Sequence, residues 1–225
     1  MAPPDPARIG KDKAISFDVS TMLIVVVGKE PNEKRFLVHE GFVCARSAFF
    51  QRAMNGPWAE RDERIIKLPE DDPEVFAIYV NFVYTNTVAT GPLERPIHRA
   101  TARTEYMLLS KLYVLCEKLC DIAAKNAVLQ AIRAVSSEVT DSGEMYIANL
   151  SAVQIIYAGT PKGSLGRRLM ADMWTGMVVE HLVKCGDEMP REFLLDMVVA
   201  HRRDRPSAYK NIAKRAGVDA YWEVK

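Results

Sequence analysis

The sequence predicts an α+β fold followed by a C-terminal helical extension. Three short strand-like runs, at residues 22–27, 34–38 and 64–68, lie in the first third of the chain, with helical patterns between and after them. Beyond the last run, apolar residues recur almost only at helical spacing. A chain of 225 residues suits one domain with an extension better than two large independent domains.

The first strand-like run has continuous hydrophobicity, which indicates a central strand covered on both faces. It runs from Met22 to Val27 and is closed by Gly28. A turn signal at residues 31–33 and a strand-like pattern at residues 34–38 then predict a hairpin of two antiparallel strands. The third strand is expected at residues 64–68.

Two helix starts are marked by capping residues. Between residues 41 and 55 the pattern predicts two short helices that meet near Arg46, with Ser47 capping the second. A charged loop is expected before the third strand. Asp72 and Pro73 then begin a core helix that runs to about Tyr84. After a loop at residues 85–103, helices are expected at residues 104–118, 121–135, 144–157, 166–183 and 190–200.

Composition limits the possible partners and the compartment. Thirty basic and twenty-nine acidic residues leave a net charge of +1, so no overall field favours nucleic acid or an anionic membrane. No apolar run approaches the roughly 20 residues of a membrane helix. Residues 1–13 lack the apolar core of a secretory signal, so an intracellular protein is expected, in the cytoplasm, the nucleus or both. The four cysteines, without CxxC spacing, are interpreted as small buried hydrophobes.

No pattern of a catalytic, cofactor or metal site is found. The phosphate-loop, dinucleotide, nucleophile-elbow and zinc-protease motifs are all missing, and the four histidines are scattered without metal-ligand spacing. We therefore expect neither an enzyme nor a cofactor, and no small-molecule substrate.

A series of residues between about 17 and 135 closely resembles the BTB/POZ domain. Each match is weak singly, but their order and spacing make a strong pattern. The matching residues are Arg35-Phe-Leu-Val-His39, Ser47-Ala-Phe-Phe50, Met54, Trp58-Ala-Glu60, Leu68, Asp71-Asp-Pro73, Phe76, Val83-Tyr84, Lys111-Leu-Tyr-Val-Leu115, Lys118-Leu119 and Asn126. The chain as a whole looks like the short stand-alone BTB proteins that are frequent in filamentous fungi.

The resemblance implies a small, mainly three-stranded sheet flanked by a cluster of about five helices. It gives a domain organisation of a flexible arm at residues 1–15, a BTB/POZ domain at 16–135, a helical extension at 136–200 and a basic tail at 201–225. Many such domains dock on a cullin scaffold through a bulky hydrophobic residue, any residue, then Glu. Trp58, Ala59 and Glu60 stand in that place, although Trp58 could instead pack on its own domain.

The resemblance also raises the question of a homodimer. The family's two-chain pocket usually has an Asp before the first strand and a basic residue beside the His, where this chain has Met22 and Glu40. Phe17, Val19 and Phe42 could still build an isologous contact, so homodimerisation stays open. His39 is expected to have a structural, hydrogen-bonded role.

Three functions remain possible from the sequence. The first is an adaptor that brings partners to a cullin ubiquitin ligase; the second is a self-associating scaffold or transcription-associated module; the third is an enzyme, which would need a concave pocket with titratable groups. The basic tail is a nuclear address, a phosphate-contacting patch or simply a solvated helix end, and no nucleic-acid binding is inferred from it.

Overall fold

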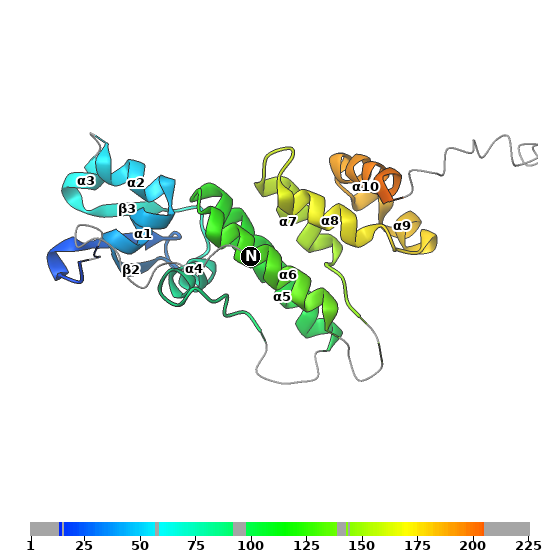
Figure 1. Ribbon diagram of the computed structural model, residues 1–225, viewed down its shortest axis with the longest axis horizontal. Helices are drawn as coiled ribbons and strands as arrows, with labels where there is room; N and C mark the ends of the chain where they lie inside the picture. Colours follow the sequence, from blue (N-terminus) through cyan, green and yellow to red (C-terminus); the bar gives the residue numbers. More distant parts are fainter. Residues whose placement is uncertain are drawn as a thin grey trace, which may run out of the picture. The chain divides into compact units, whose positions relative to one another are not determined.

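The computed structural model describes residues 14, 16–56, 59–91, 98–138, 143 and 145–204. The chain divides into two compact units, Met1–Thr160 and Pro161–Lys225 (Figure 1). The expected arm at residues 1–15 and tail at residues 201–225 lie almost wholly outside the described residues.

The first unit contains a three-stranded mixed sheet. Strand β1 (Met22–Val27) lies between β2 (Lys34–His39), with which it is antiparallel, and β3 (Ile65–Leu68), with which it is parallel. The register pairs Val25 with both Phe36 and Ile66. Leu23 and residues 25–27 are buried, as expected for a strand covered on both faces. The predicted hairpin and central strand are confirmed.

One short helix precedes the hairpin and several follow it. They are η2 (Val19–Thr21) before the sheet, then α1 (Glu40–Arg46), α2 (Ala48–Asn55), α3 (Ala59–Glu63) and α4 (Pro73–Thr85). Ser47 caps α2 by accepting a hydrogen bond from the Phe50 amide, and Asp72 caps α4 by accepting one from the Glu74 amide, as predicted. The prediction of a charged loop before β3 was wrong in part, because residues 59–63 form the short helix α3.

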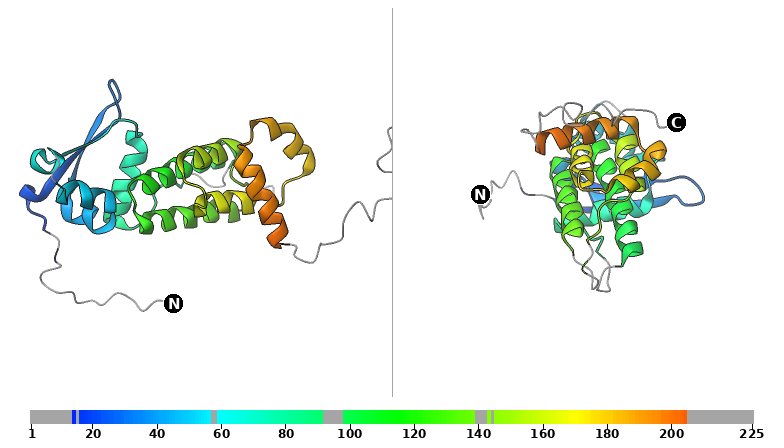
Figure 2. Two further views of the ribbon diagram at one scale, coloured as in Figure 1. Left: turned by 90° about the horizontal axis from the view of Figure 1, so that it is seen from above. Right: turned by 90° about the vertical axis from the view of Figure 1, so that its right-hand side faces the viewer.

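Three further helices complete the described part of the first unit: α5 (Arg99–Lys118), α6 (Ile122–Ser137) and α7 (Leu150–Gly159). α6 and α7 both pack on α5, and Figure 2 shows α5 and α6 side by side. α5 begins five residues before the predicted start at Thr104; the polar stretch Arg99–Arg103 hides a continuing apolar face in which Ala102 is buried. Gly159 lies so close to Val114 that a side-chain Cβ there would collide with it.

The second unit is helical: α8 (Leu165–Trp174), α9 (Val179–Cys185), η3 (Gly186–Glu188) and α10 (Arg191–Asp204). The single helix predicted at residues 166–183 was wrong, since the chain leaves helical geometry between Trp174 and Val179. α10 packs on α8, and the Trp174 and Phe193 rings meet edge to face with centroids 5.5 Å apart. The buried Arg167 is paired with Glu192 across these two helices.

Candidate protein-binding site

A cavity of about 310 Å³ opens where α2, β3 and the C-terminal end of α5 meet. Its floor is apolar and its rim carries three cations. The described residues that line it are Phe49, Arg52, Ala53, Ile66, Lys67, Lys118 and Cys120. Arg52, Lys67 and Lys118 are the charged residues of this described lining, and Lys118 is paired with Asp71 at 2.5 Å. We call this cavity the cationic pocket.

The buried carboxylate of Asp121 lies in the turn between α5 and α6, next in sequence to Cys120 of the cationic pocket. Asp121 has no exposed surface. One oxygen accepts the Ala124 amide at 2.8 Å and so caps α6, while the other accepts from Arg46 Nε and the Tyr79 hydroxyl, each at 3.3 Å. Burial and the Asp121 charge raise the pKa of the Tyr79 hydroxyl, which therefore stays a hydrogen-bond donor. α1, α4 and the turn are thus fixed to one another.

Ser47 joins α2 to the end of α5 beside the cationic pocket. Besides capping α2, its buried hydroxyl donates to the Leu119 carbonyl at 2.5 Å, and the Phe49 amide donates to the same carbonyl at 3.4 Å. Arg52 is directed along α2 by a 3.0 Å hydrogen bond from Nε to the Ala48 carbonyl. The buried Ser47 hydroxyl therefore ties α2 to the C-terminal end of α5, two of the elements that line the pocket.

The predicted docking triplet lies next to this pocket along the chain. Trp58 lies outside the described residues. Ala59 and Glu60 are the first two residues of α3, which packs on both α2 and β3, two of the elements that build the pocket. The roles predicted for Trp58, Ala59 and Glu60 therefore remain predictions. No sequence pattern indicated the cationic pocket, because its residues come from distant parts of the chain.

The residues considered for self-association form an aromatic cluster at the start of the domain. Phe17 is 68% exposed, and its ring lies edge-on to Phe42 at 5.5 Å and to His39 at 5.3 Å. Phe42 packs in turn on Tyr84 with centroids 4.9 Å apart. Val19, in η2, is 80% exposed and is a second exposed apolar residue, two positions after Phe17. Phe17 and Phe42 are thus brought together, while their role stays a prediction.

His39 has the structural role that the sequence predicts. Its Nδ1 lies 2.8 Å from the Tyr84 hydroxyl, and its backbone amide donates to the same oxygen at 2.9 Å. These two contacts join the end of β2 to the end of α4.

The two positions that depart from the family pattern are joined by one arginine. Arg64 Nη2 pairs with Glu40 at 2.8 Å, and Arg64 Nε donates to the Met22 carbonyl at 3.0 Å. Arg64 itself has a φ of 56°, in the left-handed region. Glu40 thus serves an ion pair within its own domain.

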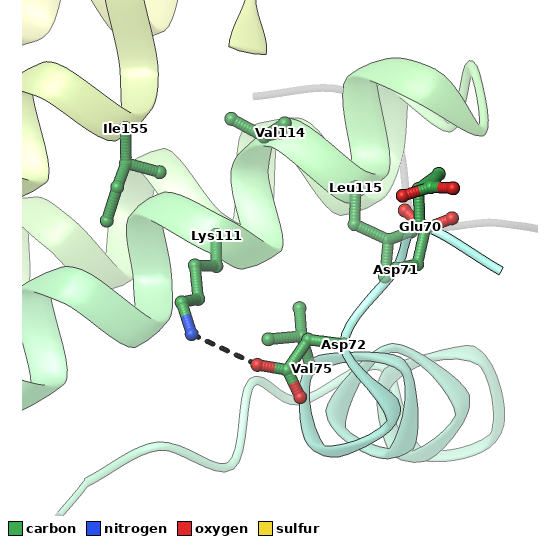
Figure 3. A pocket seen from close by; sticks show the side chains of 8 residues that line it. All are labelled: Glu70, Asp71, Asp72, Val75, Lys111, Val114, Leu115 and Ile155. Carbon is green, nitrogen blue, oxygen red and sulfur yellow. Dashed lines mark hydrogen bonds and ion pairs between the residues drawn. The ribbon is translucent and has the colours of Figure 1, made fainter. Parts of the chain in front are cut away.

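A second cavity, of about 220 Å³, lies between the N-terminus of α4, the middle of α5 and α7. Figure 3 shows its apolar and acidic lining, with the Lys111 ammonium 3.0 Å from Asp72. The described lining residues are Glu70, Asp71, Asp72, Val75, Lys111, Val114, Leu115 and Ile155. A hydrogen bond and charge from Lys29 lower the pKa of Glu70, which keeps the rim ionised. We call this cavity the acidic pocket.

The cysteines only partly match the expectation of buried hydrophobes. All four are free, and Cys116 is buried, but Cys44 and Cys185 are half-buried and Cys120 is exposed. Cys120 leaves the core because it occupies the turn after α5 with a φ of 55°. Its Sγ lies 3.7 Å from Arg52 Nη2, on the rim of the cationic pocket.

Neither a metal site nor a membrane segment is found in the described part of the chain. No group of three or more His, Cys, Asp or Glu side chains there is arranged to hold a metal ion. Among the described helices, none combines the length and apolar character needed to cross a bilayer.

Comparison with known proteins identifies the first unit. Residues 18–123 match the family model of the BTB/POZ domain. A protein of Arabidopsis thaliana described as "ARM repeat protein interacting with ABF2" is 29% identical over 120 residues, which cover 52% of this chain and 16% of that protein. The chain thus spans only a small part of the length of this relative. BTB/POZ domains mediate contacts between proteins and often form dimers. The match, the mixed sheet and its helices together show that this chain contains a BTB/POZ domain.

Proposed function

We propose that the protein is a non-enzymatic BTB adaptor that binds a cullin scaffold and so recruits partners to a ubiquitin ligase. The observation that carries the proposal is the cationic pocket, which lies beside α3, where the resemblance to the family places the docking triplet. The proposal places the protein inside the cell, in the cytoplasm, the nucleus or both.

The pocket suits a partner helix that presents an aromatic or aliphatic side chain next to a carboxylate. The apolar side chain would cover Phe49 and Ile66, while the carboxylate would pair with Arg52 or Lys67. Burial of one aromatic side chain removes about 150–250 Å² from water, worth roughly 4–6 kcal/mol before the costs of association. Trp58 and Glu60 would add a second anchor from this chain to a pocket on the partner.

The test is size-exclusion chromatography with light scattering of the full chain mixed with a cullin N-terminal domain. We expect a complex with the wild type, and loss of the complex with Trp58→Ala and with Lys67→Glu. Lys34→Glu is the matched control, because Lys34 is also an exposed strand lysine but lies on β2, the opposite edge of the sheet. Absence of a complex with the wild type would rule the adaptor function out.

A self-associating scaffold is the second candidate, and the exposed Phe17 and Val19 favour it. Exposed apolar side chains at the same place on two copies can form a two-fold contact. We expect a concentration-dependent dimer in light scattering that Phe17→Asp together with Val19→Asp abolishes. A monomer at every concentration would contradict this candidate and leave the adaptor function untouched.

A further inference from the structure

The helix α10 is apolar on two opposite sides. Phe193 and Met197 are buried on the side that packs on α8. The other side carries four large apolar side chains at positions i, i+1, i+4 and i+5, each between 40% and 61% exposed. They are Leu194, Leu195, Val198 and Val199, and we call this set the outer face of α10. A helix at the surface of a globular protein normally has one apolar side, so the outer face is a surface for a binding partner.

An arginine lies at each end of the outer face. Arg191 and Arg202 are about three turns apart, roughly 16 Å along the axis, and both lie on the same side of the helix as Val198. Both are exposed, and Arg191 makes no ion pair among the described residues. Glu192 and Arg203 pair instead with side chains of α8. The outer face is thus an apolar stripe with a cation at each end.

The charges at the two ends disfavour a second copy of α10 as the partner. In an antiparallel pair of α10 helices that sets Leu195 against Val198, Arg191 of each copy lies opposite Arg202 of the other. In a parallel pair in register, each arginine lies opposite its own copy. Like charges that face each other oppose association, so the outer face is better suited to an apolar segment with a carboxylate at each end.

The sequence that follows α10 contains such a segment. Residues 219–223 read Asp-Ala-Tyr-Trp-Glu, an aromatic pair between two carboxylates, whereas residues 205–218 contain no acid. A connection as long as residues 205–218 can span up to roughly 46–50 Å, far more than the length of the outer face. Two carboxylates four residues apart can themselves span up to roughly 13–14 Å, close to the distance between the arginines. Because the segment is part of the same chain, its effective concentration at α10 is on the order of millimolar, and modest contacts suffice to bind it.

We propose that residues 218–224 bind the outer face of α10, with the aromatic pair over the apolar stripe and Glu223 paired with Arg191. Asp219, the first acid of the segment, lies toward the Arg202 end, where the chain leaves the helix. The proposal goes beyond the adaptor function and does not depend on it, because the second unit takes no part in the cullin contact proposed above. Another protein that binds the outer face must displace this segment.

The test is fluorine NMR of the full chain labelled with 5-fluorotryptophan, since Trp222 is one of only three tryptophans. We expect the Trp222 signal, assigned with Trp222→Phe, to differ from that of the blocked peptide of residues 217–225. Val198→Asp should return it to the peptide position, while the Trp174 signal reports that the core of the second unit is intact. Ile122→Asp, at an exposed apolar residue of α6, is the matched control and should leave Trp222 unchanged. A wild-type signal at the peptide position, or one that Val198→Asp does not move, would overturn the proposal.

Charge exchange tests the ion pair. Arg191→Glu should lower the equilibrium constant between the bound and unbound segment about two- to fivefold, and Arg191→Glu together with Glu223→Lys should restore it. Arg133→Glu, at an exposed arginine of α6, is the control and should have no effect. Failure of the double variant to restore binding would contradict the pair. A Trp222 signal that changes with protein concentration would mean that the segment binds a second copy, and would contradict binding within one chain.

Discussion

The two compact units of this chain bury charge in different ways. In the BTB unit, Asp121 is fully buried and takes hydrogen bonds from Arg46, Tyr79 and the Ala124 amide. In the second unit, Arg167 is buried, but its partner Glu192 has a side chain that is 59% exposed. The first arrangement ties several elements to one point, whereas the second links two helices at the surface of a small core. We therefore expect the stability of the BTB unit to depend on the hydrogen bonds that meet at Asp121. The stability of the second unit should depend on a few large apolar side chains.

The largest expected loss of stability comes from a substitution at Asp121 in the BTB unit. Asp121→Ala removes the partner of the half-buried Arg46 and the cap of α6, and should lower the free energy of unfolding of this unit by about 3–5 kcal/mol. Chemical denaturation of the full chain, followed by signals assigned to each unit, measures the loss. Lys29→Ala, which breaks the exposed ion pair with Glu70, is the control and should cost less than about 1 kcal/mol. Similar losses in the two variants would contradict the central role of Asp121.

The next effect should be confined to the second unit. Trp174 is 1% exposed and packs on Phe193, so Trp174→Ala should destabilise this unit by about 3–5 kcal/mol while the BTB transition stays in place. Val183→Ala, at a residue 77% exposed, is the matched control and should change the free energy of unfolding by less than about 0.5 kcal/mol. If Trp174→Ala moved both transitions together, the two units would unfold as one.

A smaller loss of stability is expected from a substitution where α7 packs on α5 in the BTB unit. Gly159→Ala places a methyl group against Val114 on α5 and should cost about 1–3 kcal/mol by overpacking. Gly176→Ala, in the second unit, adds a methyl group where no heavy atom lies within 4 Å and should be close to neutral. Both values come from the same denaturation experiment. If Gly159→Ala left the free energy of unfolding unchanged, α7 would have to shift against α5 without cost.

The smallest change is chemical and leaves the fold intact. Burial and the Glu40 charge raise the pKa of the Cys44 thiol to about 11, so at pH 8 only about one molecule in a thousand carries the reactive thiolate there. Alkylation followed by mass spectrometry should modify the exposed Cys120 first, and Cys44 should react faster as the pH rises toward 11. Rapid labelling of Cys44 at pH 8 would show that the BTB core opens locally.

Much of the fold could be predicted because its signals are local. The continuous apolar run of β1 and the caps Ser47 and Asp72 depend on neighbouring residues, and each was placed correctly. The failures have local causes too. The polar composition of residues 59–63 and 99–103 concealed helical structure, and the apolar residues that continue past Trp174 concealed the break before α9.

The candidate site was less predictable because it is assembled from distant parts of the chain. The cationic pocket brings Phe49 and Ile66 together with Lys118, and no spacing rule relates residues so far apart in sequence. The Lys118–Asp71 pair, which joins one lining residue of each pocket, is equally non-local. Only the triplet at residues 58–60 could be located beforehand, because the resemblance to the family fixes its place.

The exposed lysine and arginine side chains on the edge strands of the sheet also oppose aggregation. β2 and β3 form the two edges of the sheet, and each presents exposed cations, Lys34 and Arg35 on β2 and Lys67 on the four-residue β3. Short or charged edge strands discourage the strands of other molecules from extending a sheet. Lys67 therefore protects an edge of the sheet as well as lining the cationic pocket. A variant that replaces it with an apolar residue would risk fibrous self-assembly together with any loss of binding, so charged replacements are the sound choice at this position.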